Sequence, residues 1–230
     1  MSENKSFSID HCIVQNVPPT AYYIPNYISE KEETSLITNI YSAPKPKWTQ
    51  LSNRRLQNWG GIPHTNGMIA ETIPSWLDDY LDKIHALNVM DGKRPNHVLV
   101  NEYQPGQGIM PHLDGSLFHP TITTLSIGSH IVLKFVETSS EEDIKTSNHV
   151  FSLLLEPRSL LILQDQLFSY YLHCIDDITD DVLDDTVANL NMCSGPYVRG
   201  SVARRDTRLS LTIRHVPKTT SFKLNIGNKR

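Results

Sequence analysis

The sequence predicts a mainly β fold with flanking helices, in which a double-stranded β-helix (jelly roll) is backed by N-terminal helices. Apolar residues recur at helical spacing only in the first part of the chain, and eight short segments with two-residue alternation follow. Turn-forming residues separate those segments. A helical layer followed by many short strands is typical of a jelly roll covered on one side. At 230 residues the chain is short for two domains, so we expect a single domain over residues 1–230.

Two helices are expected before the strands begin. Ser29-Glu30-Lys31-Glu32 fits a capping box, and Leu36, Ile37 and Ile40 follow it at helical spacing. A second helix opens at Ser75, and its apolar residues form one stripe that we assign to the core.

The strands are expected where apolar and polar residues alternate. Their ranges are His97–Tyr103, Gly108–Asp114, Ile122–Ile127, Ile131–Val136, His149–Leu155, Ser159–Gln164, Ser169–His173 and Thr207–Val216. Because jelly rolls carry many activities, this architecture alone names no function.

Composition excludes several classes of protein. Apolar residues make up 39% of the chain, which argues against wholesale disorder, and no apolar run is long enough to span a membrane. Three scattered cysteines indicate neither a disulfide framework nor a cysteine zinc site. The N-terminus does not resemble a signal peptide, and we expect a reducing, intracellular location.

Two long segments interrupt the strand pattern. Residues 48–67 hold two tryptophans, two arginines and several turn formers, and they form either a binding segment or an ordinary edge hairpin. Residues 175–200 begin with six aspartates and belong to an acidic stretch, whereas 199–230 carry 9 Lys and Arg against 1 Asp. A basic segment of this kind fits an anionic partner or an ordinary solvated surface.

The first chemical motif is an H-x-D sequence. His112 and Asp114 are two residues apart, so on a strand both would face one side and could bind one metal ion. His173, at the end of a later strand, is the best candidate for a third ligand. Two imidazoles and one carboxylate on one face suit a non-haem iron. Alone the motif is weak, because chance gives about 0.65 such pairs in a chain of this composition.

The last strand strengthens this hypothesis. Arg208, Ser210, Thr212 and Arg214 share one face, and the residues between them are apolar. If the polar face lines the interior of the barrel, its guanidinium groups need an anion, and a dicarboxylate meets that need. If it faces water, it is an ordinary polar surface.

Another pair on an earlier strand allows the same two interpretations. Asn101 and Tyr103 share a face and could orient carboxylate oxygens, or could simply be polar residues at a strand end.

In this order, N-x-Y, H-x-D, a distant His and R-x-S-x-T-x-R resemble the AlkB family of Fe(II)- and 2-oxoglutarate-dependent dioxygenases, over nearly the whole chain. The resemblance implies His112, Asp114 and His173 as the catalytic Fe(II) ligands. It implies 2-oxoglutarate and O2 as co-substrates. The residues that it assigns to 2-oxoglutarate are Asn101, Tyr103, Arg208, Thr212 and Arg214. Ser210 departs from the Asn of bacterial relatives.

The resemblance also implies a substrate and a reaction. Residues 54–61 resemble the nucleotide-recognition lid of the family, with Arg54, Arg55 and Trp59 as candidate substrate-binding residues. We expect oxidative demethylation of methylated nucleic acid, single-stranded or with a flipped base, with RNA favoured over DNA.

Alternatives remain open at this point. They are a reader of modified RNA or DNA with little turnover, and a protein hydroxylase or demethylase on the same iron centre. We expect a monomer in nucleus and cytoplasm, with no membrane association. Thirty-five positions separate His173 from Arg208, and the Asp-rich insert that fills them is a lid or a surface for a protein partner.

Overall fold

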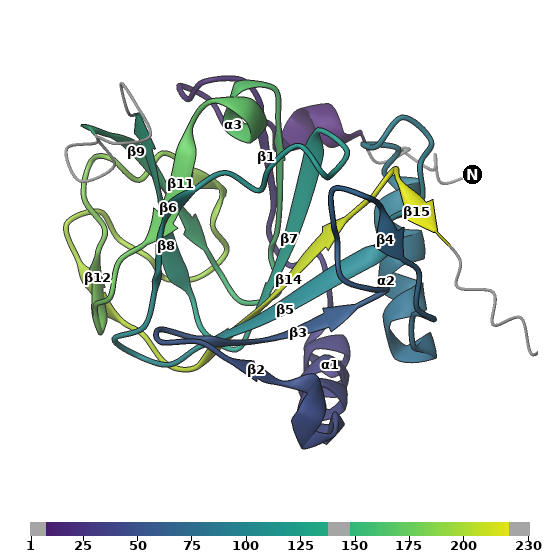
Figure 1. Ribbon diagram of the computed structural model, residues 1–230. Helices are drawn as coiled ribbons and strands as arrows, with labels where there is room; N and C mark the ends of the chain where they lie inside the picture. Colours follow the sequence, from purple (N-terminus) through teal and green to yellow (C-terminus); the bar gives the residue numbers. More distant parts are fainter. Residues whose placement is uncertain (1–7, 138–147, 221–230) are drawn as a thin grey trace, which may run out of the picture.

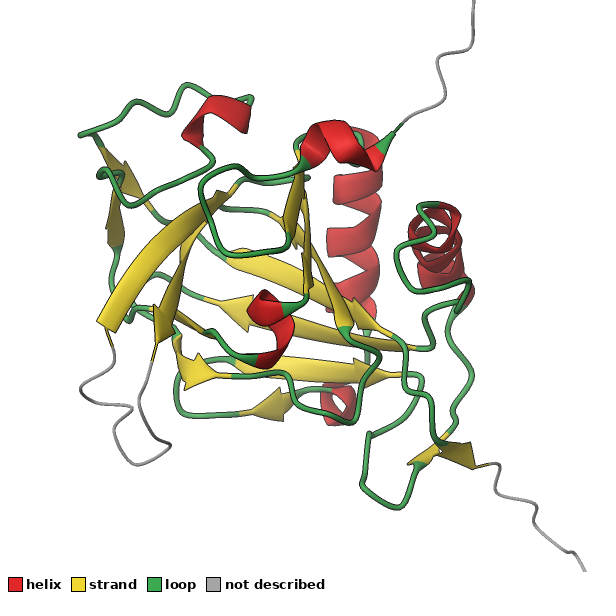
Figure 2. Cartoon of the chain, turned by 90° about the horizontal axis from the view of Figure 1, so that it is seen from above, coloured by secondary structure: helices red, strands yellow, loops and turns green. Residues whose placement is uncertain are grey.

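Two antiparallel sheets face one another and form a jelly roll (Figures 1 and 2). The computed structural model describes residues 8–137 and 148–220. The larger sheet has the order β1 (Ala21–Ile24), β10 (Leu160–Gln164), β7 (Thr121–Ile127), β14 (Arg208–Arg214), β5 (His97–Tyr103), β3 (Arg55–Trp59) and β2 (Thr49–Gln50). The smaller sheet has the order β6 (Ile109–His112), β11 (Leu172–Ile175), β8 (Ile131–Glu137) and β9 (Asn148–Leu155). Four of the eight expected strand segments lie in each sheet, which confirms the predicted fold class.

Helices cover the outer face of the larger sheet. Both expected helices are present, α1 (Glu30–Ser42) and α2 (Ser75–Ala86), and the capping box at Ser29 is formed in full. Their apolar stripes pack against outward-facing residues of β5, β7, β10 and β14 in one buried cluster. Figure 1 shows α1 and α2 on the side of the larger sheet away from β6, β8 and β11. The helical layer thus leaves the inner face of the sheet free for a site.

Strand β14 divides two environments. Its apolar residues Leu209, Leu211 and Ile213 enter the cluster with the helices. Arg208 and Arg214 point to the inner face instead and are nevertheless buried, at 2% and 5% exposure. Of the two interpretations of this strand, the structure therefore supports the interior one.

Two strand boundaries differ from prediction around the H-x-D motif and its distant histidine. The chain over Gln166–Ser169 is a helical turn, α3, and β11 begins only at Leu172. His173 is therefore near the start of a strand, not at its end. Strand β6 ends at His112, so Asp114 lies in the following loop. In both places a short run of polar and aromatic residues gives the alternating pattern of a strand, although the chain turns there.

Both long segments that interrupt the strand pattern contain strands that pair with other strands. Within 48–67, β3 pairs with β5 and β2 pairs with β3, so the two strands extend the edge of the larger sheet, which matches the edge-hairpin alternative. The 175–200 insert carries β12 (Asp180–Val182), which pairs with β13 (Val202–Arg204). Asp181 of β12 is buried and forms a bidentate ion pair with Arg205 at 2.7 and 2.8 Å.

The remaining elements are small. They are the parallel pair β4 (Met68–Ile69) and β15 (Thr219–Thr220), and 3-10 turns at Ile9–Cys12, Lys45–Lys47 and Leu190–Met192. Over the described ranges, none of the helices is both long and apolar enough to cross a membrane. The basic residues beyond position 220 lie outside the described ranges.

Candidate active site

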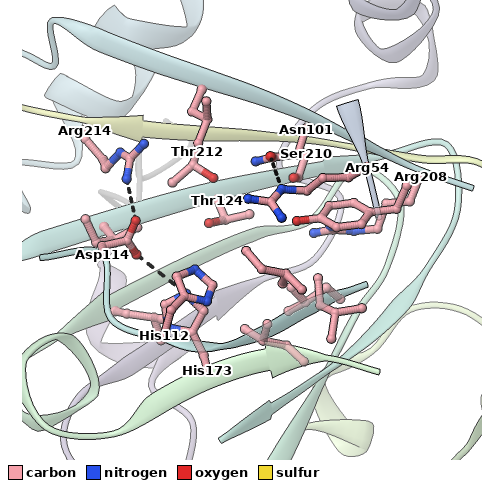
Figure 3. Close-up of a pocket in the computed structure, with 18 of the residues that line it drawn as sticks. Arg54, Asn101, His112, Asp114, Thr124, His173, Arg208, Ser210, Thr212 and Arg214 are labelled. Atoms are coloured by element: carbon pink, nitrogen blue, oxygen red, sulfur yellow. Dashed lines mark hydrogen bonds and ion pairs between the residues drawn. The ribbon is translucent and has the colours of Figure 1, made fainter. Parts of the chain in front are cut away.

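A cavity of about 210 Å³ lies between the two sheets (Figure 3). All eight residues expected to bind metal or co-substrate line it: Asn101, Tyr103, His112, Asp114, His173, Arg208, Thr212 and Arg214. They come from β5, β6, β11 and β14 and the loop after β6. The volume is below the ~300–1,000 Å³ of pockets for drug-sized ligands. The cavity therefore suits a small co-substrate.

Strand pairing brings the two histidines together. His173 of β11 is the direct partner of His112 of β6, and their ring centroids are 4.4 Å apart. The Nδ1 atom of His112 lies 2.9 Å from the carbonyl oxygen of Met110. Because a carbonyl only accepts, Nδ1 must donate, which leaves Nε2 as a lone-pair donor for a metal.

Asp114 lies between the histidine pair and an arginine. One carboxylate oxygen accepts a hydrogen bond from Arg214 Nη1 at 2.5 Å, and the other lies 3.7 Å from His173 Nε2. Across the described ranges, no group of three such side chains is spaced for coordination as it stands.

The donor set itself fits a metal. Burial, and secondarily the neighbouring His112, lower the pKa of His173 to about 4, so its ring is neutral at physiological pH. Neutral imidazole is the form that binds metals. The Nδ1 atom of His173 is buried and has no hydrogen-bond partner among the described residues. Two imidazoles with one carboxylate match the donors of non-haem iron sites.

The other end of the cavity is cationic. Arg208 donates one hydrogen bond, from Nη2 to Ser126 Oγ at 2.8 Å, and its guanidinium lies 5.8 Å from the Tyr103 ring centroid. Within the part of the chain that the structure describes, its Nε and Nη1 atoms have no partner. Burial lowers the pKa of Arg208 to about 10, so it remains charged at neutral pH. A buried cation with two free donors is the chemistry expected of an anion site.

Two residues that support this site were not predicted. Ser126 is the hydrogen-bond partner of Arg208, and its position on the inner face of β7 follows from the alternation of that strand. Phe118 lies against Arg214, with the guanidinium carbon 3.9 Å from the ring centroid. No sequence pattern marks Phe118, because its loop brings it over the sheet only in three dimensions.

His97 is a buried imidazole beside this site. It is 1% exposed, its ring lies 5.8 Å from that of Phe118, and its Nε2 is 3.4 Å from Asn58 Oδ1. Burial, and secondarily the charge of Arg214, lower the pKa of His97 to about 3. The ring is therefore neutral in the folded protein and free to protonate only on unfolding.

This difference predicts a loss of stability in acid. Below pH 6.5 His97 becomes protonated in the unfolded state but stays neutral in the folded state, whose pKa is about 3. The free energy of unfolding therefore falls as the pH decreases towards 3. Between pH 7 and 5 we expect His97 to account for about 2 kcal/mol of that fall. Urea unfolding of the metal-free protein and of His97→Asn at both pH values measures it. An equal pH dependence in the two proteins would contradict the assignment.

The three residues expected to bind substrate are not brought together. Arg54 lines the cavity, and its Nε donates to Asn101 Oδ1 at 3.1 Å. Arg55 points to the opposite face, where it forms a bidentate ion pair with Glu102. Trp59 also packs on that face, against Trp76 of α2. Consecutive strand residues face opposite sides, so Arg54 lies at the cavity while Arg55 and Trp59 lie on the other face, and the assignment of the three to substrate stays a prediction.

Trp59 is a packing residue of the helical layer. Its ring meets that of Trp76 edge-on at 5.6 Å, and its Nε1 donates to Gln57 Oε1 at 3.0 Å. We expect Trp59→Ala to lower the free energy of unfolding by about 2–3 kcal/mol, less than the ~3–5 kcal/mol of a fully buried tryptophan. Urea titration measures this, with Trp59→Phe as the milder control. A folded Trp59→Ala protein that loses oligonucleotide binding without losing stability would contradict this packing role and support the predicted substrate role.

Comparisons with known proteins agree with this geometry. Residues 43–214 match the 2OG-Fe(II) oxygenase superfamily. The chain is 52% identical over 226 residues to the Danio rerio protein named "Probable RNA/DNA demethylase ALKBH6", covering 96% of each. It is 26% identical to "tRNA (carboxymethyluridine(34)-5-O)-methyltransferase alkbh8" of Xenopus tropicalis, over 90% of this chain but only 34% of that longer protein.

Solved structures share the fold. OsALKBH1 superposes with a TM-score of 0.53 at 14% identity, covering 87% of this chain and 100% of that chain. A 2OG-Fe(II) oxygenase family oxidoreductase from Burkholderia pseudomallei superposes with a TM-score of 0.52 at 8% identity, covering 87% and 88%. The matched range of the superfamily contains every residue of the histidine, aspartate and arginine constellation. The chain therefore belongs to the AlkB family of the 2OG-Fe(II) oxygenase superfamily, whose members use Fe(II), 2-oxoglutarate and O2.

Proposed function

We propose that this enzyme oxidatively demethylates methylated bases of nucleic acid, and that RNA is preferred over DNA. One observation carries the proposal: the histidine pair, the carboxylate and two buried arginines meet in one cavity although they come from distant parts of the chain. The relative at 52% identity is named an RNA/DNA demethylase, which supports nucleic acid as the substrate class.

His112, Asp114 and His173 would hold the iron. When bound, Fe(II) would activate O2 together with decarboxylation of 2-oxoglutarate, and this chemistry oxidises an N-methyl C–H bond. The chain fixes the donors: the Met110 carbonyl sets the tautomer of His112, and Arg214 aligns the carboxylate of Asp114. Collapse of the oxidised methyl group releases formaldehyde and restores the base.

Arg208 would bind the carboxylate of 2-oxoglutarate that is remote from the metal. Figure 3 shows Arg208 at one end of the cavity and Asp114 with the histidines at the other. An extended diacid could therefore place one end on the metal and the other on the guanidinium. Tyr103, Asn101 and Thr212 line the space between and present a hydroxyl, an amide and a second hydroxyl to it.

The substrate base would approach at the loop after β6. Leu113 lies between two of the proposed ligands, lines the cavity and is 37% exposed, and Met110, three residues earlier in β6, is 69% exposed. An exposed apolar surface next to the metal suits the face of an unpaired or flipped base. The net charge of −4 disfavours tight nonspecific binding to duplex phosphates, which supports recognition of a single base.

Release of formaldehyde tests this function. The protein with Fe(II) and 2-oxoglutarate is incubated with RNA and DNA oligonucleotides of one sequence, each carrying one N-methylated base, and with unmethylated controls. We expect formaldehyde from the methylated strands only, more from RNA, and none with His173→Ala. Binding without turnover across the panel would favour the reader instead, and formaldehyde from a methylated peptide alone would favour a protein demethylase.

A further inference from the structure

Arg54 enters the cavity from a hairpin tip. It lies in the turn between β2 and β3, and its Nε donates to Asn101 Oδ1 at 3.1 Å. Figure 3 shows the Arg54 side chain entering the cavity from the side of Arg208, with its guanidinium next to Asn101 and Thr124 and between Arg208 and Asp114. Arg54 and Arg208 are both close enough to Tyr103 to affect its pKa, so Arg54 lies within reach of the space where the remote carboxylate of 2-oxoglutarate is proposed.

Charge is unbalanced at this end of the cavity. Three arginines line the cavity against one carboxylate, Asp114, which is already paired with Arg214. Among the described residues, the guanidinium of Arg208 hydrogen-bonds only to the hydroxyl of Ser126, and the Arg54 side chain hydrogen-bonds only to the neutral amide of Asn101. Both guanidiniums act on Tyr103, where they oppose the rise in pKa that burial causes. Two cations near one phenol, without a carboxylate of their own among the described residues, favour binding of an anion beside them.

The Asp-rich insert anchors this hairpin tip. Asn53, next to Arg54, donates from Nδ2 to Asp177 Oδ2 at 3.0 Å. Gly108 lets the insert approach, because a Cβ there would lie 2.1 Å from the Ile175 carbonyl oxygen and 2.4 Å from Asp177 Oδ1. The tip is therefore tied to a segment that lies close to the β5–β6 turn.

Arg205 fixes that segment in turn. Its Nη1 donates to the carbonyl oxygens of Asp176 at 2.7 Å and Ile178 at 3.2 Å, on either side of Asp177. Its remaining nitrogens bind the buried carboxylate of Asp181. A continuous set of contacts thus runs from the core through the insert to Asn53 and Arg54.

We infer that Arg54 is a third arginine of the co-substrate site, binding the same carboxylate of 2-oxoglutarate as Arg208, and that Asp177 positions it through Asn53. The inference rests on the proposed assignment of Arg208 to that carboxylate. In this arrangement Arg54 is a binding residue for 2-oxoglutarate, whereas Asn53 and Asp177 are positioning residues. The insert then sets co-substrate affinity without touching the co-substrate.

Calorimetric titration of the Mn(II)-loaded protein with 2-oxoglutarate tests the inference without turnover. We expect Arg54→Met to raise the Kd about tenfold, in line with loss of a charged hydrogen bond at a partly open site, and Arg54→Lys to raise it less. Asp177→Asn should raise the Kd about threefold. Asp185→Asn is the matched control, because this insert aspartate is 95% exposed and pairs only with Arg199 among the described residues.

A double variant separates positioning from general weakening. If Asp177 acts through Arg54, adding Asp177→Asn to Arg54→Met leaves the Kd of the single Arg54 variant unchanged. Multiplied effects in the double variant would overturn the positioning role of Asp177. Equal thermal melts of all variants exclude misfolding as the cause.

Two other outcomes distinguish this inference from the proposed function. If Arg54→Met binds 2-oxoglutarate normally but loses affinity for a methylated oligonucleotide, Arg54 is a substrate residue and the inference is overturned. If the unaltered protein does not bind 2-oxoglutarate at all, the proposed co-substrate site fails and the inference fails with it. Normal binding by the unaltered protein together with normal binding by Arg54→Met contradicts the inference alone.

Discussion

Replacing His112 and Asp114 together by alanine is expected to abolish the visible charge-transfer band that Fe(II) and 2-oxoglutarate produce under anaerobic conditions. Two of the three proposed donors are lost, and His173 alone cannot hold the ion. Loss of a group that merely orients a ligand weakens metal binding about 10–100-fold. We therefore expect the loss of two ligands to exceed about 100-fold and to remove formaldehyde release with the band.

A thermal melt must accompany the spectrum of this double variant. His112 and Asp114 line the cavity, and loss of Asp114 leaves the buried Arg214 without its carboxylate partner. His85→Ala is the matched control, because His85 is exposed on α2 and far in sequence from the site. A double variant that melts like the unaltered protein and still shows the band would mean that the iron ligands are misassigned.

Replacing Arg208 is expected to separate co-substrate binding from stability. Arg208→Lys keeps the charge but loses the paired geometry of the guanidinium, and should weaken 2-oxoglutarate by about 1.5–3 kcal/mol, roughly 10–100-fold in Kd. Arg208→Met removes the charge as well and should weaken binding further. Titration of the Mn(II)-loaded variants with 2-oxoglutarate measures both.

The thermal stability of the ligand-free protein should not fall when Arg208 is replaced by methionine. Arg208 is 2% exposed and has no carboxylate partner among the described residues, so its buried charge destabilises the ligand-free protein. Arg208→Met should therefore unfold at the same or a higher temperature without 2-oxoglutarate, and it should no longer be stabilised by adding it. A less stable variant with unchanged affinity for 2-oxoglutarate would assign Arg208 to the structure and not to the site.

The sequence predicted the parts of this protein that depend on local periodicity. The alternation over Arg208–Arg214 places two arginines on one face and three apolar residues on the other, and the structure buries both faces as that pattern requires. The capping box at Ser29 is likewise a local signal with one geometry. These patterns depend on neighbours within four residues, so they are readable without knowledge of the fold.

Features that depend on contacts between distant parts of the chain could not be predicted from the sequence. Trp59 and Arg54 lie in one short segment, yet one packs on a helix and the other lines the cavity, because the segment joins β5 as an edge strand. Phe118 reaches Arg214 only after its loop folds back over β14. Asp181 belongs to an acidic run that is typical of a solvated surface, but Arg205 neutralises it in the interior.

An anomalous difference map from a crystal grown with Mn(II) and 2-oxoglutarate tests the central claim most directly. We expect one strong peak enclosed by the side chains of His112, Asp114 and His173, with 2-oxoglutarate extending from it to the guanidinium of Arg208. A peak held by other residues, or a diacid bound away from Arg208, would contradict the account.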